Sequence, residues 1–337
     1  MDFRETKKYK DGIFFTKKEL EKELFKRGFD TFYYALSFGA GTQSTHLLED
    51  HFQGKIYYDY IIMSDTGAEP QFIHKQVAWW QQRQKDIGNN TPFFITKHYS
   101  MDKGLEEMLM AYIFVKEYNR LQLPLYFNTK ENGIIKPAGM MKRQCTVDYK
   151  IVPVKRLFRQ LILKKHGLLP NQRMPKNIAL IMDIGFSLDE IKRIRGYGGE
   201  YDYKYCFMAY PLVEQNLTTD DSIKFLKDNN FPSKRSRCYL CPFNCDKKDI
   251  GMDWMEIIQD EPLSFVKACW FDAQLRIVQD SGVKRLHSIP YFHYSRKSLA
   301  SVYYKEYIKL YEVYKYDLEK WINDWKDYIN KNTNKYK

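Results

Sequence analysis

Segments that fit β-strands alternate with segments that fit helices over the first two thirds of the chain, and this alternation limits the fold more than any other feature. Runs rich in β-branched and aromatic residues predict five strands, at about 31–37, 56–64, 91–98, 177–185 and 206–214. Helical patterns predict helices at 16–27, 43–51, 69–86, 102–121, 148–167 and 219–229. Such alternation is typical of parallel sheets covered by helices, so we expect an α/β fold with a doubly wound, mainly parallel five-stranded sheet.

The pattern changes in two places. After residue 121 the chain is rich in Pro, Gly and Asn, which predicts a loop before the helix at 148–167. Beyond Pro232 cysteines appear, followed by helices whose Tyr, Leu and Trp recur at helical spacing, as in a packing face. We expect an α/β domain at 1–230 and a cysteine-containing, helix-rich region at 231–337 packed on it, for which 337 residues suffice.

A glycine-rich turn follows the first expected strand, in SFGAGTQS at 37–44. In a doubly wound sheet, ligands bind where the strands end and the next helix begins. Gly39 and Gly41 let the backbone approach an anion closely, and the following helix offers free N–H groups and the positive end of its dipole. Short glycine motifs also occur in ordinary tight turns, so the loop alone leaves both interpretations open.

The loop is similar to the pyrophosphate loop (PP-loop) of the adenine-nucleotide alpha-hydrolase superfamily, usually SGGxDS. Here it is longer, and Gln43 stands where the family usually has Asp. MSDTGAEP after the second strand and DIGFSLDEIKRIR after the fourth resemble motifs of the phosphoadenosine phosphosulfate (PAPS) reductase-like branch. KRQCTVDYK and KRSRCYLCPFNC resemble paired cysteine segments of that branch and of DNA-phosphorothioation ATPase proteins. The likeness covers about residues 31–250 and implies a HUP, or Rossmann-like, nucleotide-binding fold.

The resemblance implies an ATP pyrophosphatase-type enzyme. Such enzymes bind ATP and Mg²⁺, hold the pyrophosphate on the loop, and transfer AMP to a substrate oxygen; sulfur transfer can follow. The implied nucleotide-binding residues are Ser37, Phe38, Gly39, Gly41, Gln43, Ser44, Met63, Asp65, Thr66 and Gly185. Asp65, as a ligand of Mg²⁺ or ribose, and Arg193, as a phosphate clamp, are the expected catalytic residues. Asp65 could instead cap the turn after its strand, and Arg193 could belong to a solvated helix face.

Three of the six cysteines, Cys238, Cys241 and Cys245, lie within eight residues. Cys145 is the natural fourth ligand if the fold brings both segments together. Four thiolates suit either Zn²⁺ or a [4Fe–4S] cluster. The spacing does not separate these cofactors, and the resemblance favours the iron–sulfur cluster. Free buried cysteines are the remaining alternative.

Cys206 and Cys269 are expected in the core. A reductase of the PAPS type needs a mobile catalytic cysteine near its C-terminus, and no cysteine follows Cys269. A sulfonucleotide reductase is therefore a less favoured alternative. A non-catalytic nucleic-acid-binding protein with a structural metal is another alternative, which the change to Gln43 keeps open.

The chain has a formal net charge of +12 and a pI of about 9.1, which favours polyanionic partners. Arg143, Arg235 and Arg237 flank the cysteine segments, and Arg195 ends the DIGFSLDEIKRIR motif. We expect them to bind phosphates of DNA or RNA, although a solvated basic surface has the same composition. A sulfur-donor protein is a further expected partner. The N-terminus carries no secretory signal and no apolar run is long enough for a membrane span, so a cytoplasmic location is expected. The acceptor and the oligomeric state stay open.

Overall fold

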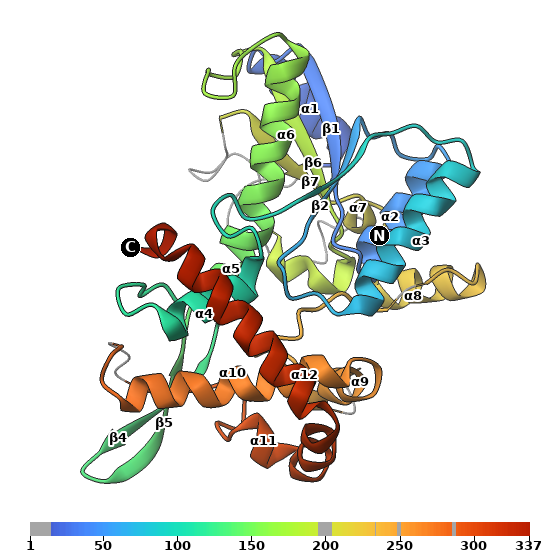
Figure 1. The fold of residues 1–337 in the computed structure, drawn as a ribbon. Helices are drawn as coiled ribbons and strands as arrows, with labels where there is room; N and C mark the ends of the chain where they lie inside the picture. Colours follow the sequence, from blue (N-terminus) through green and yellow to red (C-terminus); the bar gives the residue numbers. More distant parts are fainter. Residues whose placement is uncertain (1–14, 195–203, 233, 248–250, 285–287) are drawn as a thin grey trace. The chain divides into compact units, whose positions relative to one another are not determined.

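The computed structural model describes residues 15–194, 204–232, 234–247, 251–284 and 288–337 of the chain (Figure 1). Their contacts divide the chain into two compact units. Unit 1 comprises Met1–Ser64, Ile73–Thr96 and Ile151–Ser236, and unit 2 comprises Asp65–Phe72, Lys97–Lys150 and Arg237–Lys337. The units interleave along the chain, whereas a single boundary at residue 230 was expected.

Unit 1 contains a sheet of five parallel strands in the order β3-β2-β1-β6-β7, which confirms the α/β class. The strands are β1 (Thr31–Ser37), β2 (Tyr60–Ser64), β3 (Phe93–Thr96), β6 (Ile178–Ile184) and β7 (Cys206–Ala209). The expected strand at 206–214 ends early because Pro211 begins a short helix, α7 (Pro211–Glu214). Proline is well tolerated at the first position of a helix but cannot donate to a sheet.

Helices contribute to two apolar clusters with the strands of this sheet. The helices with residues in unit 1 are α1 (Lys17–Lys26), α2 (Thr42–Phe52), α3 (Gln71–Asp86), α6 (Val152–Lys165), 3-10 helix η2 (Leu188–Arg193), α7 and α8 (Thr219–Asp228). Leu20 and Leu24 of α1 pack with Ile181 of β6 in one cluster. Phe158 of α6 packs with Leu180 of β6 in another. Because side chains alternate along a strand, these neighbouring β6 residues point to opposite sheet faces, so both faces are covered.

Unit 2 combines helices with small antiparallel sheets. Its strands are β4 (Tyr126–Glu131), β5 (Ile134–Met140), β8 (Asp246–Lys247), β9 (Gly251–Met252) and β10 (Ile289–Tyr291). Its helices are α4 (Gly104–Phe114), α5 (Gln144–Thr146), α9 (Asp253–Asp260), α10 (Pro262–Asp280), α11 (Leu299–Val302), α12 (Tyr304–Lys331) and 3-10 helix η3 (Thr333–Tyr336); a π-helical turn, η1 (Val147–Ile151), runs across the boundary to unit 1. Leu318, Trp325 and Ile329 of α12 are buried, which confirms the expected packing face. No helix of the described residues has the length and apolar character of a membrane span.

The region after residue 121 is a hairpin of β4 and β5, and the expectation of a loop there was wrong. Asn132 and Gly133 connect the strands with positive φ angles of 50° and 80°. Two consecutive residues of this conformation form the tight turn that matches the twist of a hairpin. Pro137 and Gly139 within β5 hid the strand, because both residues are unfavourable in central strands.

Candidate functional site

The glycine loop lies at the carboxyl edge of the sheet in unit 1, between its two longest strands. Ser37 at the end of β1 pairs with Ile184 at the end of β6, so the two strands end side by side at this edge of the sheet. β2, the next strand in the sequence, pairs with one edge of β1, and β6 pairs with the other edge. The strand order therefore reverses at this point, which is where open α/β sheets form a ligand crevice.

Hydrogen bonds hold the loop in a defined shape. The Gly39 N–H donates to Ser44 Oγ over 3.2 Å, and that hydroxyl donates to the Gly41 carbonyl over 3.1 Å. Ala40 has a positive φ of 52°, and its carbonyl accepts a bond from Gln76 Nε2 over 2.7 Å. Gly41 is the N-cap of α2, and no side chain of the described residues caps that helix end. The loop is thus fixed, and the Ser44 hydroxyl shapes it from within.

Gly185 fits closely against the start of α2. A Cβ added at this position would lie 2.7 Å from the Ser44 backbone nitrogen and 2.9 Å from the Ser44 Cα. Contacts below about 3 Å essentially do not occur for real Cβ atoms, and backbone cannot yield as a flexible side chain does. The glycine after β6 therefore lets the end of that strand touch the first turn of α2.

Gln43 joins the loop to the DIGFSLDEIKRIR segment at the end of β6. Its Nε2 donates to Glu190 Oε2 over 3.2 Å and lies 3.1 Å from Thr219 Oγ1. Thr219 in turn bonds to Asp189, which precedes Glu190 in η2. An Asp at position 43 would place a carboxylate against Glu190, whereas the amide of Gln43 donates to it. The departure from the usual loop sequence is thus matched by an acidic residue elsewhere in the unit.

Arg193 belongs to the same network. It forms an ion pair with Glu190, and its guanidinium lies 4.2 Å from the centre of the Phe186 ring. The side chain is half exposed, so one face of the guanidinium stays accessible to solvent. Arg195 lies outside the described residues.

The other expected nucleotide-binding residues fall into two groups. Phe38 and Met63 are buried, so their side chains belong to the core, and the Phe38 N–H donates to the Ile62 carbonyl. Asp65 follows β2 directly and belongs to unit 2, where its Oδ1 accepts from the Gly67 N–H over 2.8 Å. This bond caps the turn after β2, which was the alternative expected for Asp65 beside a role as a ligand of Mg²⁺ or ribose. Its Oδ2 also lies 3.3 Å from Lys97 Nζ.

Thr66 connects this turn to the cysteines within unit 2. Its hydroxyl lies 2.7 Å from Glu69 Oε1 and 3.2 Å from Cys238 Sγ. A Cβ at Gly104 would lie 1.9 Å from the Thr66 carbonyl oxygen, so α4 begins in direct contact with the turn. The DTG turn, which the sequence assigned to the nucleotide, is therefore also a wall of the cysteine region.

All four candidate metal ligands lie in unit 2. The Cys241 N–H bonds to the Cys238 carbonyl over 3.1 Å, as in a tight C-x-x-C turn. Cys145 and Cys241 pack against the same apolar cluster. The Arg143 guanidinium lies 5.1 Å from the centre of the Phe243 ring, which joins the two cysteine segments. The structure thus brings together residues about 95 positions apart in sequence.

Charged groups surround these thiols. Burial, with the neighbouring Cys241, raises the pKa of Cys145, although Arg143 acts in the opposite direction. Burial also raises the pKa of Cys238 far above its usual range, and the nearby Glu69 adds to this effect. Burial alone would lower the pKa of Lys150, but Cys238, Glu69 and Cys241 raise it above its ordinary value. Lys150 therefore supplies a positive charge beside the thiols that the sequence did not single out.

No group of three or more His, Cys, Asp or Glu side chains among the described residues has the arrangement of a metal site. Thiolates nevertheless suit a soft metal or cluster, and the Cys238–Cys241 turn and the packing of Cys145 with Cys241 on one apolar cluster bring three of the four candidate thiols into the same part of unit 2. Cys206 and Cys269 are buried in the core, as expected.

The candidate phosphate-binding arginines differ in their surroundings. Arg143 in unit 2 and Arg235 in unit 1 are exposed. Arg237 is buried, with 7% of its side chain exposed, and it pairs with Asp253 and Glu256. Two carboxylates already neutralise this guanidinium, so its expected role in phosphate binding is not supported. Asp253 and Glu256 lie 16 and 19 residues after Arg237 in the sequence. No pattern in the sequence near Arg237 indicates that these carboxylates pair with it.

Comparison of the chain with protein-family models, curated proteins and solved structures finds no match. The proposed relationship therefore rests on the motifs and on the loop geometry described above.

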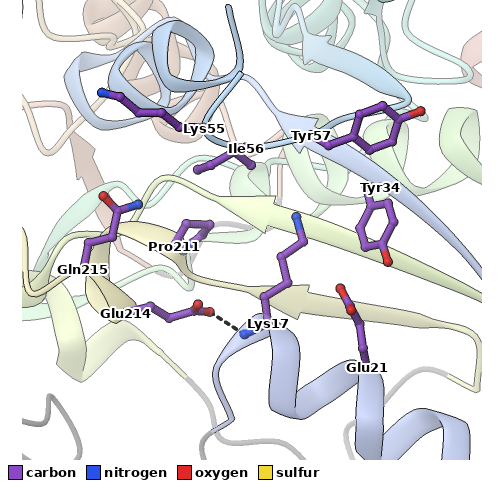
Figure 2. A pocket seen from close by; sticks show the side chains of 9 residues that line it. All are labelled: Lys17, Glu21, Tyr34, Lys55, Ile56, Tyr57, Pro211, Glu214 and Gln215. Atoms are coloured by element: carbon purple, nitrogen blue, oxygen red, sulfur yellow. Dashed lines mark hydrogen bonds between the residues drawn. The ribbon is translucent and has the colours of Figure 1, made fainter. Parts of the chain in front are cut away.

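Unit 1 also contains a cavity of about 410 Å³ that the sequence did not reveal (Figure 2). It is lined by Lys17, Glu21, Tyr34, Lys55, Ile56, Tyr57, Pro211, Glu214 and Gln215. Lys17 Nζ lies 3.0 Å from Asp183 Oδ2, which also accepts a bond from the buried Tyr58 hydroxyl over 2.9 Å. The Glu214 carboxylate accepts a bond from the Lys17 backbone N–H, as Figure 2 shows. An internal ion pair and a half-buried carboxyl thus lie along this cavity.

Glu214 should make stability depend on pH. Burial raises the pKa of Glu214 to about 7, so between its unfolded pKa and pH 7 the folded chain binds more protons than the unfolded chain. The stabilisation from this group is therefore present below the unfolded pKa and is lost as pH rises through 7. We expect Glu214→Gln to raise the free energy of unfolding at pH 8 by on the order of 1 kcal/mol, allowing for partial exposure, with no gain at pH 4.5.

Urea unfolding at both pH values measures the effect, and Glu21→Gln on the same cavity is the matched control. Equal effects of Glu214→Gln at pH 4.5 and pH 8 would show that Glu214 titrates normally.

Proposed function

We propose that the protein is an ATP pyrophosphatase-type enzyme that binds ATP on the loop at 37–44 and adenylates a substrate. One observation carries this proposal: a fixed, glycine-containing loop lies where the strand order reverses, with Gly185 against the first turn of α2. Helices that pack on both faces support a doubly wound, HUP-like sheet around this point.

The loop supplies the chemistry that cleavage at the α-phosphate requires. Charge grows on the leaving pyrophosphate, and preorganised N–H groups of the loop and of the first turn of α2 stabilise it. Arg193, which contacts Glu190 and Phe186, is the guanidinium that we propose to bind a phosphate. Asp65 would hold Mg²⁺ when ATP is bound. In the structure Asp65 Oδ1 caps its own turn and Oδ2 lies 3.3 Å from Lys97 Nζ, so a metal at Oδ2 would replace Lys97 as its partner.

We further propose that Cys145, Cys238, Cys241 and Cys245 hold a [4Fe–4S] cluster, with Zn²⁺ as the alternative. The observations that support this are the shared unit, the C-x-x-C turn, and Lys150 as a compensating cation. Such a cluster would supply sulfur or electron chemistry to an activated acceptor. A nucleic acid is the acceptor that the basic composition favours, and thiolation is the modification that the cysteines favour.

A second candidate is a non-catalytic nucleic-acid-binding protein with a structural metal. The bonds of Gln43 to Glu190 and Thr219 favour it, because they occupy a loop residue that usually carries a carboxylate.

Product analysis with α-labelled ATP, with and without DNA or tRNA, separates the two functions. We expect AMP and pyrophosphate from the first and no turnover from the second. We also expect Gly41→Val with Ser44→Ala to abolish ATP binding, because a Cβ at position 41 would lie 3.3 Å from Ser236 Cβ and crowd the loop, while loss of the Ser44 hydroxyl removes the bonds to Gly39 and Gly41 that hold its shape. Ser301→Ala with Gly139→Val, at positions remote from the loop in sequence, is the matched control. Unchanged ATP affinity in the loop variant, measured by calorimetry, would contradict the proposal.

A further inference from the structure

The hairpin of β4 and β5 is a feature that the proposed ATP site does not use. Figure 1 shows it as a two-stranded ribbon that extends past α10. The ribbon turns at Asn132 and Gly133, and β10 pairs with β4 near its base. In the described part of the sheet, β10 pairs with β4 only at residues 126–128, so the outer part of the ribbon has no strand partner beyond β4 and β5 themselves.

The base of the ribbon is held firmly. Arg296 Nε donates to the Phe127 carbonyl, and Arg296 Nη2 donates to the Ala138 carbonyl, each over 3.0 Å. These two bonds clamp both strands from one guanidinium, which also lies 5.8 Å from the centre of the Tyr126 ring. A clamped base makes the tip a rigid extension, and a rigid element loses little entropy on binding.

The tip exposes large apolar side chains. Ile134 is 60% exposed and Ile135 is 56% exposed, directly after the turn, and Met140 is exposed further along β5. Adjacent residues of a strand point to opposite faces, so an isoleucine projects from each face of the ribbon. Clustered exposed apolar residues on a protruding element are typical of an interaction site.

The ribbon and its flank are also basic. Residues 126–143 contain four basic residues and one acidic residue. The basic residues are Lys130, Lys136, Lys142 and Arg143, and all of them are exposed. Lys136 lies 3.5 Å from Glu131, but both side chains are more than half exposed. Exposed pairs of this kind are weak, so a phosphate can replace the glutamate.

Strand addition by another protein is disfavoured at this edge. β5 is the outer strand of its sheet in the described residues, and it carries Lys136 and Pro137. Proline lacks the N–H that a new strand would bond, and lysine on an edge opposes pairing. The charge and the blocked edge together favour a polyanion over a β-strand partner.

We propose that the hairpin at 126–140 is a DNA-binding ribbon that enters the major groove of duplex DNA, with the face that carries Ile135 toward the base edges and Ile134 on the opposite face. Lys130, Lys136 and Lys142 contact the flanking phosphates. A two-stranded ribbon fits the B-form major groove, whereas the major groove of A-form RNA is too narrow and deep for side chains to read. The inference rests on the proposed nucleic-acid acceptor and narrows it to duplex DNA.

The experiment compares two variants of the full chain by fluorescence anisotropy with a labelled DNA duplex across a salt series. Lys130→Glu with Lys136→Glu removes two phosphate contacts and should reduce the salt slope by about 1.8. Ile134→Ser with Ile135→Ser should weaken binding about tenfold while leaving the slope unchanged. Lys305→Glu with Lys309→Glu, and Ile308→Ser with Val313→Ser, make the same changes at exposed positions of α12. RNA duplexes should bind about tenfold more weakly than DNA.

Equal losses in the ribbon and α12 variants would overturn the proposal, as would equal affinity for RNA and DNA duplexes. If Ile134→Ser with Ile135→Ser leaves DNA binding intact but reduces self-association in size-exclusion chromatography, the tip is a contact between copies of the chain. ATP turnover is measured separately in every variant. Loss of DNA binding with normal ATP turnover supports the ribbon, while absence of turnover in the wild-type chain rejects the proposed enzyme and leaves the ribbon assay informative.

Discussion

Replacing Gly185 with alanine should lower ATP turnover about a hundredfold, the loss expected when reacting groups are displaced by about 1 Å. The added Cβ would lie 2.7 Å from the Ser44 backbone nitrogen. Either the first turn of α2 or the segment after β6 must move, and the N–H groups that we propose to bind the pyrophosphate move with it. ATP affinity and release of labelled AMP measure the effect.

The same substitution should cost on the order of 1–3 kcal/mol of stability, because it overpacks backbone against backbone. Gly139→Ala is the matched control, since a Cβ at Gly139 has no atom within 4 Å. Urea unfolding separates loss of fold from loss of function. A folded Gly185→Ala variant with wild-type turnover would show that this contact does not shape the nucleotide site.

Loss of any one of the four candidate cysteine ligands should remove most of the bound metal. A tetrahedral thiolate site has no spare ligand, and a structural metal contributes directly to folding. We expect Cys238→Ala, Cys241→Ala, Cys245→Ala and Cys145→Ala each to lower iron and sulfide, or zinc, in anaerobically purified protein. A brown colour with broad visible absorbance would identify the cluster.

Cys269→Ala is the control, because Cys269 is buried in the core of the same unit. Cys145 is the informative position, since it comes from a separate segment. Full metal content in Cys145→Ala beside its loss in Cys241→Ala would remove Cys145 from the site. Full metal content in all four variants would reject the site altogether.

The regular part of the fold was predictable because local patterns determine it. The strand at Thr31–Ser37 and the helix expected at 16–27, found as α1 with Thr16 as its N-cap, depend on neighbouring residues, and both were found as expected. The hairpin was missed, because Pro137 and Gly139 weaken the strand signal of β5. The turn at Asn132 and Gly133 was the one local signal that could have revealed it.

The site was predictable only where its residues lie in one segment. The glycine loop and the C-x-x-C turn are local, so the sequence displayed them. The bonds of Gln43 to Glu190 and Thr219 join residues 147 and 176 positions apart, and only the fold shows them. The burial of Arg237 depends likewise on carboxylates from α9. Charge in a sequence does not show which charges are already paired.

The interleaving of the two units along the chain limits how recombination between genes can exchange them. The chain passes between unit 1 and unit 2 at five places, after residues 64, 72, 96, 150 and 236. A single genetic crossover therefore cannot exchange one unit and leave the other whole. The turn that carries Asp65 belongs to unit 2 but lies in the chain between two segments of unit 1. The two cysteine segments likewise adjoin segments of unit 1 in the chain. Homologous chains should consequently vary by substitution and by loop insertion, and gene fusion should add material only at the ends.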